Sequence, residues 1–421
     1  MIALPLLLPD TPLTLDTLET TIHPWGLAVM QHAFAAAWSA QAAHRPLRPC
    51  PDCHACVHHP AGTKSRHLET RFGPVVISRQ RRRCQACGRH FQPDDAFLAP
   101  VLGRGRCTPV LRILAAQCGA SWPYRQAADV LGMLRGSPLA PETIRQVVAV
   151  AGSGVADQYA REATAACAPP ATAPAPTIAP MQVEVVLDGA WIHAHDTVHG
   201  MEIKVGVVHT GSEQCGATRT RLRDRRYAAT AAGVAAFGPL VTAAIDRVEG
   251  FAAATQTLLG DGAAWIWRLG AAIVPQATPV LDRWHLRDAR RRATRAAVPD
   301  KEARRPWSVR LEEALDVGAV VEAVQIVRAI QQRYPHTALT QFATYLVNQR
   351  ERIPNYAMRQ AAGETIGSGS GEKGVDIVVN RRLKGRRGMC WWRKRADGVV
   401  ALRLALLNDE WEPRLAAVAA A

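Results

Sequence analysis

Four cysteines form the clearest chemical pattern in this 421-residue sequence. They occur as two Cys-x2-Cys pairs, Cys50 with Cys53 and Cys84 with Cys87. One tight turn presents two thiolates at this spacing, and Zn²⁺ prefers four such ligands in a tetrahedron. We therefore predict a structural Zn²⁺ site, formed by two turns at the ends of a β-hairpin.

Other side chains in the same segment leave alternatives open. Cys56 could replace Cys50, and a histidine could join the site, the candidates being His54, His58, His59 and His67. A basic cluster beside the cysteines suggests contact with nucleic-acid phosphates, although a solvated basic surface would have the same composition. The cluster comprises Arg79, Arg81, Arg82, Arg83 and Arg89.

Three acidic residues stand out by their position. Asp188 and Asp261 are each followed by Gly, and each is predicted to end a β-strand. Glu372 follows the glycine-rich sequence IGSGSG at a predicted helix start. Acids at the ends of strands, with one on a helix beside them, can bind two Mg²⁺ ions about 4 Å apart. Ligation by oxygen alone favours Mg²⁺ or Mn²⁺ over Zn²⁺, and a two-ion site suits displacement at a phosphodiester.

The elements around the cysteines indicate a modular N-terminal part. Residues 15–43 have helical periodicity, and residues 50–91 indicate a hairpin that is interrupted at Gly73-Pro74. Helix-forming residues return over 107–152. There we expect a helix around 124–131, a turn over 132–140 and a helix opened by Pro141. This pair has the size of a helix-turn-helix, in which Arg145 and Gln146 would read DNA.

An uncharged Pro/Ala-rich stretch over 166–180 predicts a linker, after which the pattern changes to alternation. Strands are expected around 183–187, 201–207 and 220–227, followed by a helix over about 229–248. Apolar runs at 255–259 and 278–281 then alternate with helices, which is typical of an α/β fold with parallel strands. Residues 285–362 are predicted to be helical throughout, and helix returns after Gly363.

Composition limits the class of protein. Hydrophobic residues make up 48% and charged residues 21%, the balance of an ordinary globular protein. The net charge of +15, spread over both halves, favours a polyanionic partner, nucleic acid before membrane. No apolar stretch is long enough for a membrane span. The apolar start lacks a basic region, so we take it as mature sequence, and clustered cysteines suggest a metal site in the reducing cytoplasm.

Several motifs resemble the DDE transposases of bacterial insertion sequences. They are DGAWI at Asp188, GDGAAWIW at Asp261, LDRWH with Asp282 and His285, and IGSGSGE at Glu372 leading into NRRLKGRRGMCWW. The chain resembles in particular the zinc-ribbon-bearing group related to the ISKra and ISLre elements, and more distantly the Mutator-like transposases. The resemblance runs from about residue 50 to residue 411.

The resemblance implies a ribonuclease-H-like catalytic domain with an all-helical insertion between the second Asp and the Glu. By that resemblance Asp188, Asp261 and Glu372 form the catalytic, magnesium-binding triad, and Asp282 and His285 support it. An alternative takes Asp282 as the second catalytic acid. Basic residues after Glu372 would hold the DNA backbone, and tryptophans could stack on an unpaired base. These residues are Arg381, Arg382, Lys384, Arg386 and Arg387, with Trp391, Trp392 and Trp307.

The expected activity is Mg²⁺-dependent cleavage of DNA at element ends and strand transfer to a target, without a covalent enzyme intermediate. Expected partners are double-stranded DNA, in terminal repeats and target, and further copies of the chain as a dimer or larger assembly. A nucleoid-associated location in a bacterial cytoplasm follows. Two alternatives stay open: a non-catalytic, transposase-derived DNA-binding regulator, and a structural zinc protein without a nucleic-acid partner.

The expected domains follow the same boundaries. They are a helical lead-in (1–45), a zinc ribbon (46–100), a helical DNA-binding module (101–165), the linker (166–180), and a ribonuclease-H-like domain in two parts (181–286 and 363–421) around the helical insertion (287–362).

Overall fold

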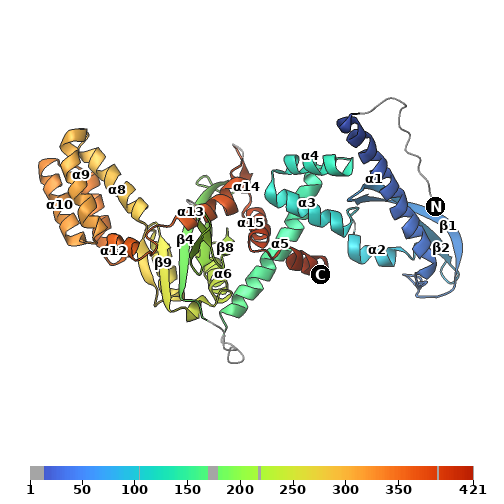
Figure 1. Ribbon diagram of the computed structural model, residues 1–421. Coiled ribbons are helices and arrows are strands. Elements are labelled where there is room, and N and C mark those ends of the chain that lie inside the picture. The colour runs from blue at the N-terminus through green and yellow to red at the C-terminus, as the bar shows by residue number, and fades with distance from the viewer. Residues whose placement is uncertain (1–13, 104, 169–178, 217–219, 386–387, 421) are drawn as a thin grey trace. The chain divides into compact units, whose positions relative to one another are not determined.

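The computed structural model describes residues 14–103, 105–168, 179–216, 220–385 and 388–420 (Figure 1). The chain divides into two compact units, each with its own internal packing. The N-terminal unit comprises residues 1–151 and 415–421, and the sheet unit comprises residues 152–414. No helix among the described residues is both long and apolar enough to cross a membrane.

The N-terminal unit is built on a long β-hairpin. Strands β1 (His58–Thr70) and β2 (Gly73–Cys84) pair antiparallel, and the short β3 (His90–Phe91) adds to β2. Helix α1 (Leu15–Ala40) and helix α2 (Asp95–Leu102) contribute apolar side chains that pack on the hairpin. This small core contains Leu68, Val75, Ile77, Leu98 and Leu102, with Phe34 and Trp38 against it. The predicted lead-in helix and hairpin are confirmed.

Helices α3 (Pro109–Ser121) and α4 (Tyr124–Arg135) complete this unit, together with the first part of α5 (Pro141–Ala166), up to Ala151. The predicted turn at 132 is wrong, because α4 continues through Gly132 and ends at Gly136, whose φ of 66° is the left-handed conformation that glycine favours. The buried Arg135 at the end of α4 forms an ion pair with Glu69 of the hairpin. The predicted linker lies largely outside the described residues.

The sheet unit contains a mixed sheet with the strand order β10-β9-β4-β5-β8. Strand β4 pairs antiparallel with β5 and parallel with β9; β5 pairs antiparallel with β8, and β9 parallel with β10. A short strand β11 pairs with the far end of β4. The bounds are β4 (Gln182–Ala194), β5 (Met201–His209), β8 (Arg226–Thr230), β9 (Thr255–Gly260), β10 (Thr278–Leu281) and β11 (Cys390–Trp391).

The third strand of the sheet differs from the prediction for residues 220–227. Residues Thr220–Leu222 instead form β7, which pairs with β6 (Ser212–Gln214) in a separate two-stranded hairpin. The third sheet strand is β8, whose buried run begins at Tyr227, whereas Thr220 and Arg221 are exposed. The strand therefore follows the apolar residues that can be buried, and it begins six positions and ends three positions later than expected.

Helices cover both faces of this sheet. Helix α6 (Val234–Asp246) lies on the face that carries Leu187, and α13 (Gly369–Val375) on the opposite face, beside Val186. Helix α7 (Ala264–Ile273) packs beside α6, and α15 (Arg393–Leu407) packs against β8. After α13 the chain continues as η4 (Asp376–Asn380) and α14 (Arg381–Leu383), and α16 (Trp411–Ala420) ends the described chain.

A helical insertion separates β10 from α13, as predicted. It consists of α8 (Arg283–Ala297), α9 (Lys301–Asp316), α10 (Val320–Arg333), α11 (Thr337–Gln349) and α12 (Tyr356–Ala361). Buried side chains such as Leu311, Val327, Ile330 and Leu346 form its own apolar core. Helix α8 begins two residues after β10 ends, so the insertion is connected to the edge strand of the sheet (Figure 1).

Candidate functional site

The four predicted cysteines come together in the N-terminal unit. The Sγ atoms of Cys50, Cys53, Cys84 and Cys87 all lie within 4.8 Å of one another, and across the described residues no other group of three or more potential ligands is clustered in this way. The Cys50–Cys87 and Cys53–Cys84 sulfur distances are 3.6 and 3.4 Å. A tetrahedral ion with Zn–S bonds of about 2.3 Å needs sulfurs about 3.8 Å apart. This group could therefore bind a structural Zn²⁺.

Two tight turns place these thiols. His54 adopts a φ of 58° and its N–H donates to the Cys50 carbonyl, while Gly88 adopts a φ of 72° and donates to the Cys84 carbonyl. A backbone hydrogen bond from Cys87 is the main cause that lowers the pKa of Cys84, to about 7. The pKa values of Cys53 and Cys87 are raised, so thiolate character is not shared by all four residues. It is the two turns that direct the sulfurs towards one point, as metal binding requires.

The alternative zinc ligands are not part of the cluster. Cys56 is exposed and His58 packs edge-on against Phe91 with a ring separation of 5.2 Å. Nε2 of His58 lies 3.1 Å from the carbonyl oxygen of Arg48. His58 therefore supports the turn from outside the thiol group.

The basic cluster beside the cysteines is only partly available to a partner. Arg79 is buried and paired with Asp95, which does not favour its predicted contact with a phosphate. Arg89 pairs with Asp52. Arg81 and Arg83 are exposed, and the half-buried Arg82 donates to Gln80.

The register of the sheet brings the acidic residues to one level. Val186 of β4 lies opposite Leu259 of β9, so the pairing continued two residues further sets Asp188 opposite Asp261. The predicted strand end at Asp188 is wrong: β4 continues to Ala194, because Gly189 stays extended and pairs with β5. It is β9 that ends, at Gly260, which opens the edge of β4 beside Asp188.

Glu372 approaches the same place from α13. A methyl group at Gly371 would lie 2.8 Å from Cγ1 of Val186 and 3.7 Å from Cβ of Asp188. Glycine is needed here because the backbone of α13 lies directly on β4. The adjacent Glu372 is exposed, and Asp261 is half-buried. Both side chains therefore keep the freedom to turn towards a shared ion.

The carboxylates of this site influence one another. Burial is the main cause that raises the pKa of Asp188, and the charges of Asp261 and Glu372 raise it further. The His285 ring and the Gly189 N–H act in the opposite direction. A carboxyl held against two like charges is typical of sites that bind a cation, which would offset the repulsion.

Asp282 has a different environment from the other acids. It is fully buried and begins α8, where Oδ1 accepts the His285 N–H at 2.7 Å and lies 3.1 Å from the His285 ring. Its Oδ2 accepts the N–H and the hydroxyl of Ser368. Burial acts to raise the pKa of Asp282, but these donors hold it at about 2. Contact with Asp282 raises the pKa of His285.

The saturated carboxylate of Asp282 favours a positioning role. Both of its oxygens are occupied by groups that tie the start of α8 to the segment before Glu372, and Arg283 N–H also donates to the Ile366 carbonyl. Asp261 accepts one hydrogen bond, from Ala263 N–H to Oδ1. Ser368 was not identified from the sequence, and its place in the glycine-rich motif was the available signal.

The helical insertion holds the loops that follow β9 and β10. Gln349 donates to the Gly262 carbonyl at 3.0 Å, and the Tyr356 hydroxyl donates to the Leu281 carbonyl at 2.8 Å. A methyl group at Gly262 would lie 3.0 Å from the Tyr345 hydroxyl oxygen. These partners lie far away in sequence, so no local pattern predicts them.

A comparison with family models identifies a relationship across both parts of the chain. The model of the uncharacterised protein family UPF0236 matches residues 61–409. The chain belongs to this family. No curated protein matches it significantly. The UPF0236 match includes Cys84, Cys87 and all the candidate acids, and it begins after Cys50 and Cys53.

The predicted DNA-backbone residues after Glu372 differ in accessibility within this UPF0236 chain. Arg381 and Lys384 are exposed, although Arg381 also pairs with Asp376. The side chain of Arg382 is buried near the Trp391 ring, which does not favour its predicted contact with DNA. Arg386 and Arg387 lie outside the described residues.

The candidate stacking residues differ in the same way. Trp391 is buried and donates to the Leu383 carbonyl, an arrangement that does not favour its predicted stacking on a base. Trp392 is exposed and stacks on His195 with a ring separation of 5.2 Å. Trp307 of α9 is half-buried, with the Arg310 guanidinium 6.0 Å from its ring centre.

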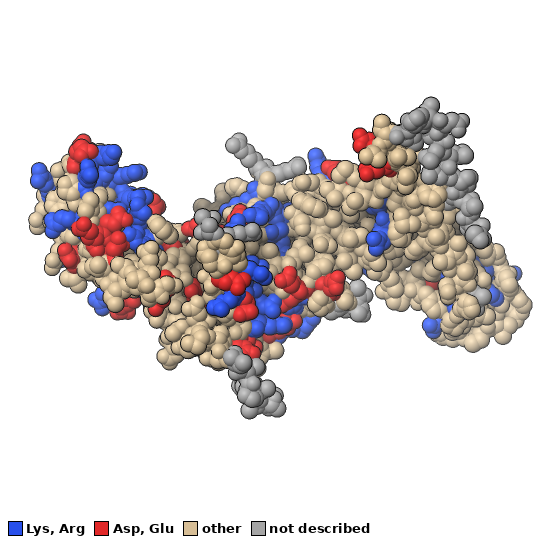
Figure 2. Space-filling model, viewed as in Figure 1, with Lys and Arg blue, Asp and Glu red and all other residues tan. Residues whose placement is uncertain are grey.

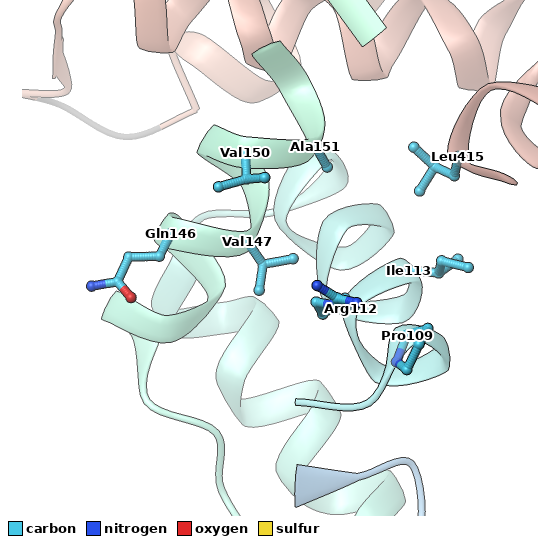
Figure 3. A pocket seen from close by; sticks show the side chains of 8 residues that line it. All are labelled: Pro109, Arg112, Ile113, Gln146, Val147, Val150, Ala151 and Leu415. Atoms are coloured by element: carbon cyan, nitrogen blue, oxygen red, sulfur yellow. The ribbon is translucent and has the colours of Figure 1, made fainter. Parts of the chain in front are cut away.

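The helix pair proposed to read DNA presents an apolar hollow rather than a basic surface. Arg145 and Gln146 both donate to Glu142 on the same helix. A cavity of about 220 Å³ opens beside them, between α3, α5 and Leu415 (Figure 3). Its lining is mainly apolar and includes Ile113, Val147 and Val150, together with the charged Arg112.

Proposed function

We propose that this UPF0236 member is a DNA transposase that cleaves and joins phosphodiesters through the carboxylates Asp188, Asp261 and Glu372. The observation that carries the proposal is the pairing of β4 with β9 up to Val186 and Leu259, two residues before Asp188 and Asp261, together with the close contact of Gly371, next to Glu372, with β4. The three acids come from separate chain segments, and the pKa of Asp188 is raised. Both features support a site that binds cations and promotes nucleophilic attack on a phosphate.

A ribonuclease-H-like fold for the sheet unit is part of this proposal. The mixed sheet supports it, because an antiparallel β4-β5-β8 meander adjoins the parallel strands β9 and β10. The helical insertion between Asp261 and Glu372 agrees with the same interpretation. We interpret the hairpin with its four cysteines as the zinc ribbon.

The residues would divide the work as follows. Asp188, Asp261 and Glu372 would hold two Mg²⁺ ions, which supply an activated water or 3′-hydroxyl and stabilise the leaving oxygen. Asp282 holds the turn that carries His285, and it fixes the approach of the Glu372 segment through Ser368. Either Asp261 or Asp282 could be the second metal-binding acid of the triad. Asp261 is favoured, because both carboxylate oxygens of Asp282 already accept hydrogen bonds.

The proposed substrate is duplex DNA, at the ends of a mobile element and at a target site. The net charge of +15 supports a polyanion, and exposed Arg81, Arg83, Arg381 and Lys384 are the candidate phosphate contacts. Two ends must be joined in one reaction, so we propose that the chain acts as a dimer or larger assembly on DNA. A location at the bacterial nucleoid would follow.

Cleavage of DNA that carries the gene's own flanking sequence tests the proposal. With Mg²⁺ present, the wild-type chain is expected to nick at defined positions. Asp188→Asn, Asp261→Asn and Glu372→Gln should each reduce the rate by at least about a hundredfold, the scale of losing a group that stabilises the transition state. DNA retention on a gel should not decrease, because these variants remove negative charge.

The matched control is Asp288→Asn, an exposed acid on α8 that pairs with Arg292. It should cleave like the wild type. DNA binding without any Mg²⁺- or Mn²⁺-dependent cleavage would instead indicate the non-catalytic regulator. Absence of salt-dependent DNA binding would refute both and favour a structural zinc protein.

A further inference from the structure

One large aromatic side chain lies exposed between the residues of the candidate site. Trp284 stands between Asp282 and His285 at the start of α8, and 55% of it is exposed, whereas the neighbouring Asp282 is fully buried. Indole rings usually bury most of their surface, so an exposed one beside a polar site needs an explanation.

The Trp284 ring is held against the segment that leads to Glu372. A methyl group at Gly367 would lie 3.0 Å from Cδ1 and 3.1 Å from Nε1 of the indole. Because Gly367 has no side chain, the ring can lie on its backbone, five residues before Glu372. The indole is therefore fixed at the site and still presents a large free surface.

Two guanidinium groups lie beside the same ring. The Arg283 and Arg287 guanidinium carbons lie 5.8 and 5.6 Å from the ring centre. Both arginines are anchored by Glu312 of α9, at 3.3 and 3.4 Å. Their direction is thus set by the insertion, and the ring stands beside cations that cannot swing away freely.

The exposed side of α8 continues this surface away from the site. Arg291 and Arg295 are exposed, seven and eleven residues after Trp284, which places all three on one face of the helix. The two arginines lie about 10 and 16 Å further along the axis. Figure 2 shows Lys and Arg side chains gathered on the insertion helices, beside a group of acidic side chains.

We propose that Trp284 stacks on an unpaired nucleobase next to the scissile phosphate, while Arg291 and Arg295 hold the phosphates of the same strand. A flat aromatic surface with nearby cations and a carboxylate site matches the chemistry of a nucleotide: a base, and phosphates on either side. Bases inside a duplex are already stacked on their neighbours, so the partner must be a base that is unpaired at or beside the break. The inference rests on the proposed function.

A forked DNA duplex tests this contact without requiring cleavage. The probe carries 2-aminopurine as its first unpaired base, and a fully paired duplex of the same sequence is the comparison; no divalent cation is added. The wild-type chain should quench the 2-aminopurine fluorescence and bind the fork more tightly than the paired duplex. Loss of one stacked base corresponds to about a 5- to 150-fold weaker affinity, so Trp284→Ala should remove the preference by that factor.

Two further variants separate stacking from packing. Trp284→Phe keeps an aromatic face and should retain most of the quench, whereas Trp284→Leu fills similar space without one and should behave like Trp284→Ala. Phe251→Ala is the matched control, because Phe251 is a 43% exposed aromatic residue near the start of β9, at the opposite end of that strand from Asp261.

The outcomes distinguish the two proposals. Equal fork preference in the wild type, Trp284→Ala and Trp284→Leu would overturn the stacking inference and leave the transposase proposal standing. A wild-type chain that binds neither probe would contradict both. A uniform loss of affinity for fork and duplex in Trp284→Ala would assign the residue a general role in the fold and overturn the inference as well.

Discussion

Replacement of Asp282 by Ala offers the sharpest test of how this site is built. If Asp282 positions other residues, its loss should destabilise the sheet unit even without DNA or metal. If Asp282 served only to bind metal and made no stabilising contacts, its removal would reduce the repulsion between neighbouring carboxylates. The free energy of unfolding would then stay unchanged or increase. The structure favours the first result, because both carboxylate oxygens are engaged in a fully buried position.

The size of the effect follows from the groups that lose their acceptor. The His285 N–H at the start of α8 loses its cap, which costs about 1 kcal/mol. The Ser368 N–H and hydroxyl lose a charged acceptor, and each buried donor left unpaired costs about 1–3 kcal/mol. Such terms are not fully additive, so we expect a loss of about 3–5 kcal/mol in the free energy of unfolding.

Urea unfolding of the full chain, followed by tryptophan fluorescence, measures this loss. Asp282→Asn retains one acceptor oxygen and should fall between the wild type and Asp282→Ala. Asp288→Ala, on the exposed side of the same helix, should stay within about 0.5 kcal/mol of the wild type. If Asp282→Ala unfolds at the wild-type urea concentration with an unchanged slope, the positioning role is refuted.

Three further predictions concern the same elements. Wild-type protein should contain one Zn²⁺ per chain by elemental analysis, and Cys84→Ser should lose the metal and the protease resistance of the hairpin, while Cys56→Ser should keep both. Gly371→Ala should cost about 1–3 kcal/mol in urea unfolding and slow cleavage, because the added methyl would meet Val186, whereas Gly369→Ala has free space and should be neutral. The pKa of Asp282 is about 2 when folded, below the ordinary value of about 3.9, so its carboxylate stabilises the fold fully above that ordinary value and loses this contribution as pH falls towards 2. The stability gap between wild type and Asp282→Asn should therefore narrow between pH 5 and pH 2, and a constant gap would contradict the assigned hydrogen bonds.

Local patterns in the sequence predicted the parts of this molecule that depend on neighbours in the chain. The Cys-x2-Cys spacing identified the thiol cluster, and alternation or apolar runs located β4, β5, β9 and β10. The error at Asp188 has a local cause: Gly189 suggested a turn, but glycine is also compatible with an extended strand that pairs with β5. A single residue type could not separate these two conformations.

Partners distant in the sequence account for the other differences. Arg79 and Arg382 belong to basic runs, yet both are buried, and Arg79 is paired with Asp95. Whether a cation in such a run reaches a phosphate depends on the side of the strand or helix it occupies and on what packs there. The acceptor role of Asp282 towards Ser368 spans 86 residues and is likewise invisible to a local pattern.

The helical insertion can be understood from the same geometry. Its helices fix the loop after β9 through Gln349 and the end of β10 through Tyr356. Asp261 and Asp282 follow the ends of these two strands on short connections. Like charges lie close to them, since the carboxylates of Asp261 and Glu372 both raise the pKa of Asp188. The insertion helices bury apolar side chains of their own, such as Leu311 and Ile330. The stability gained by this packing can hold the two loops rigid. The insertion thus holds in place the loops that carry acids of like charge. It also includes α8, which begins at the candidate site with Trp284 and presents Arg291 and Arg295 further along the helix.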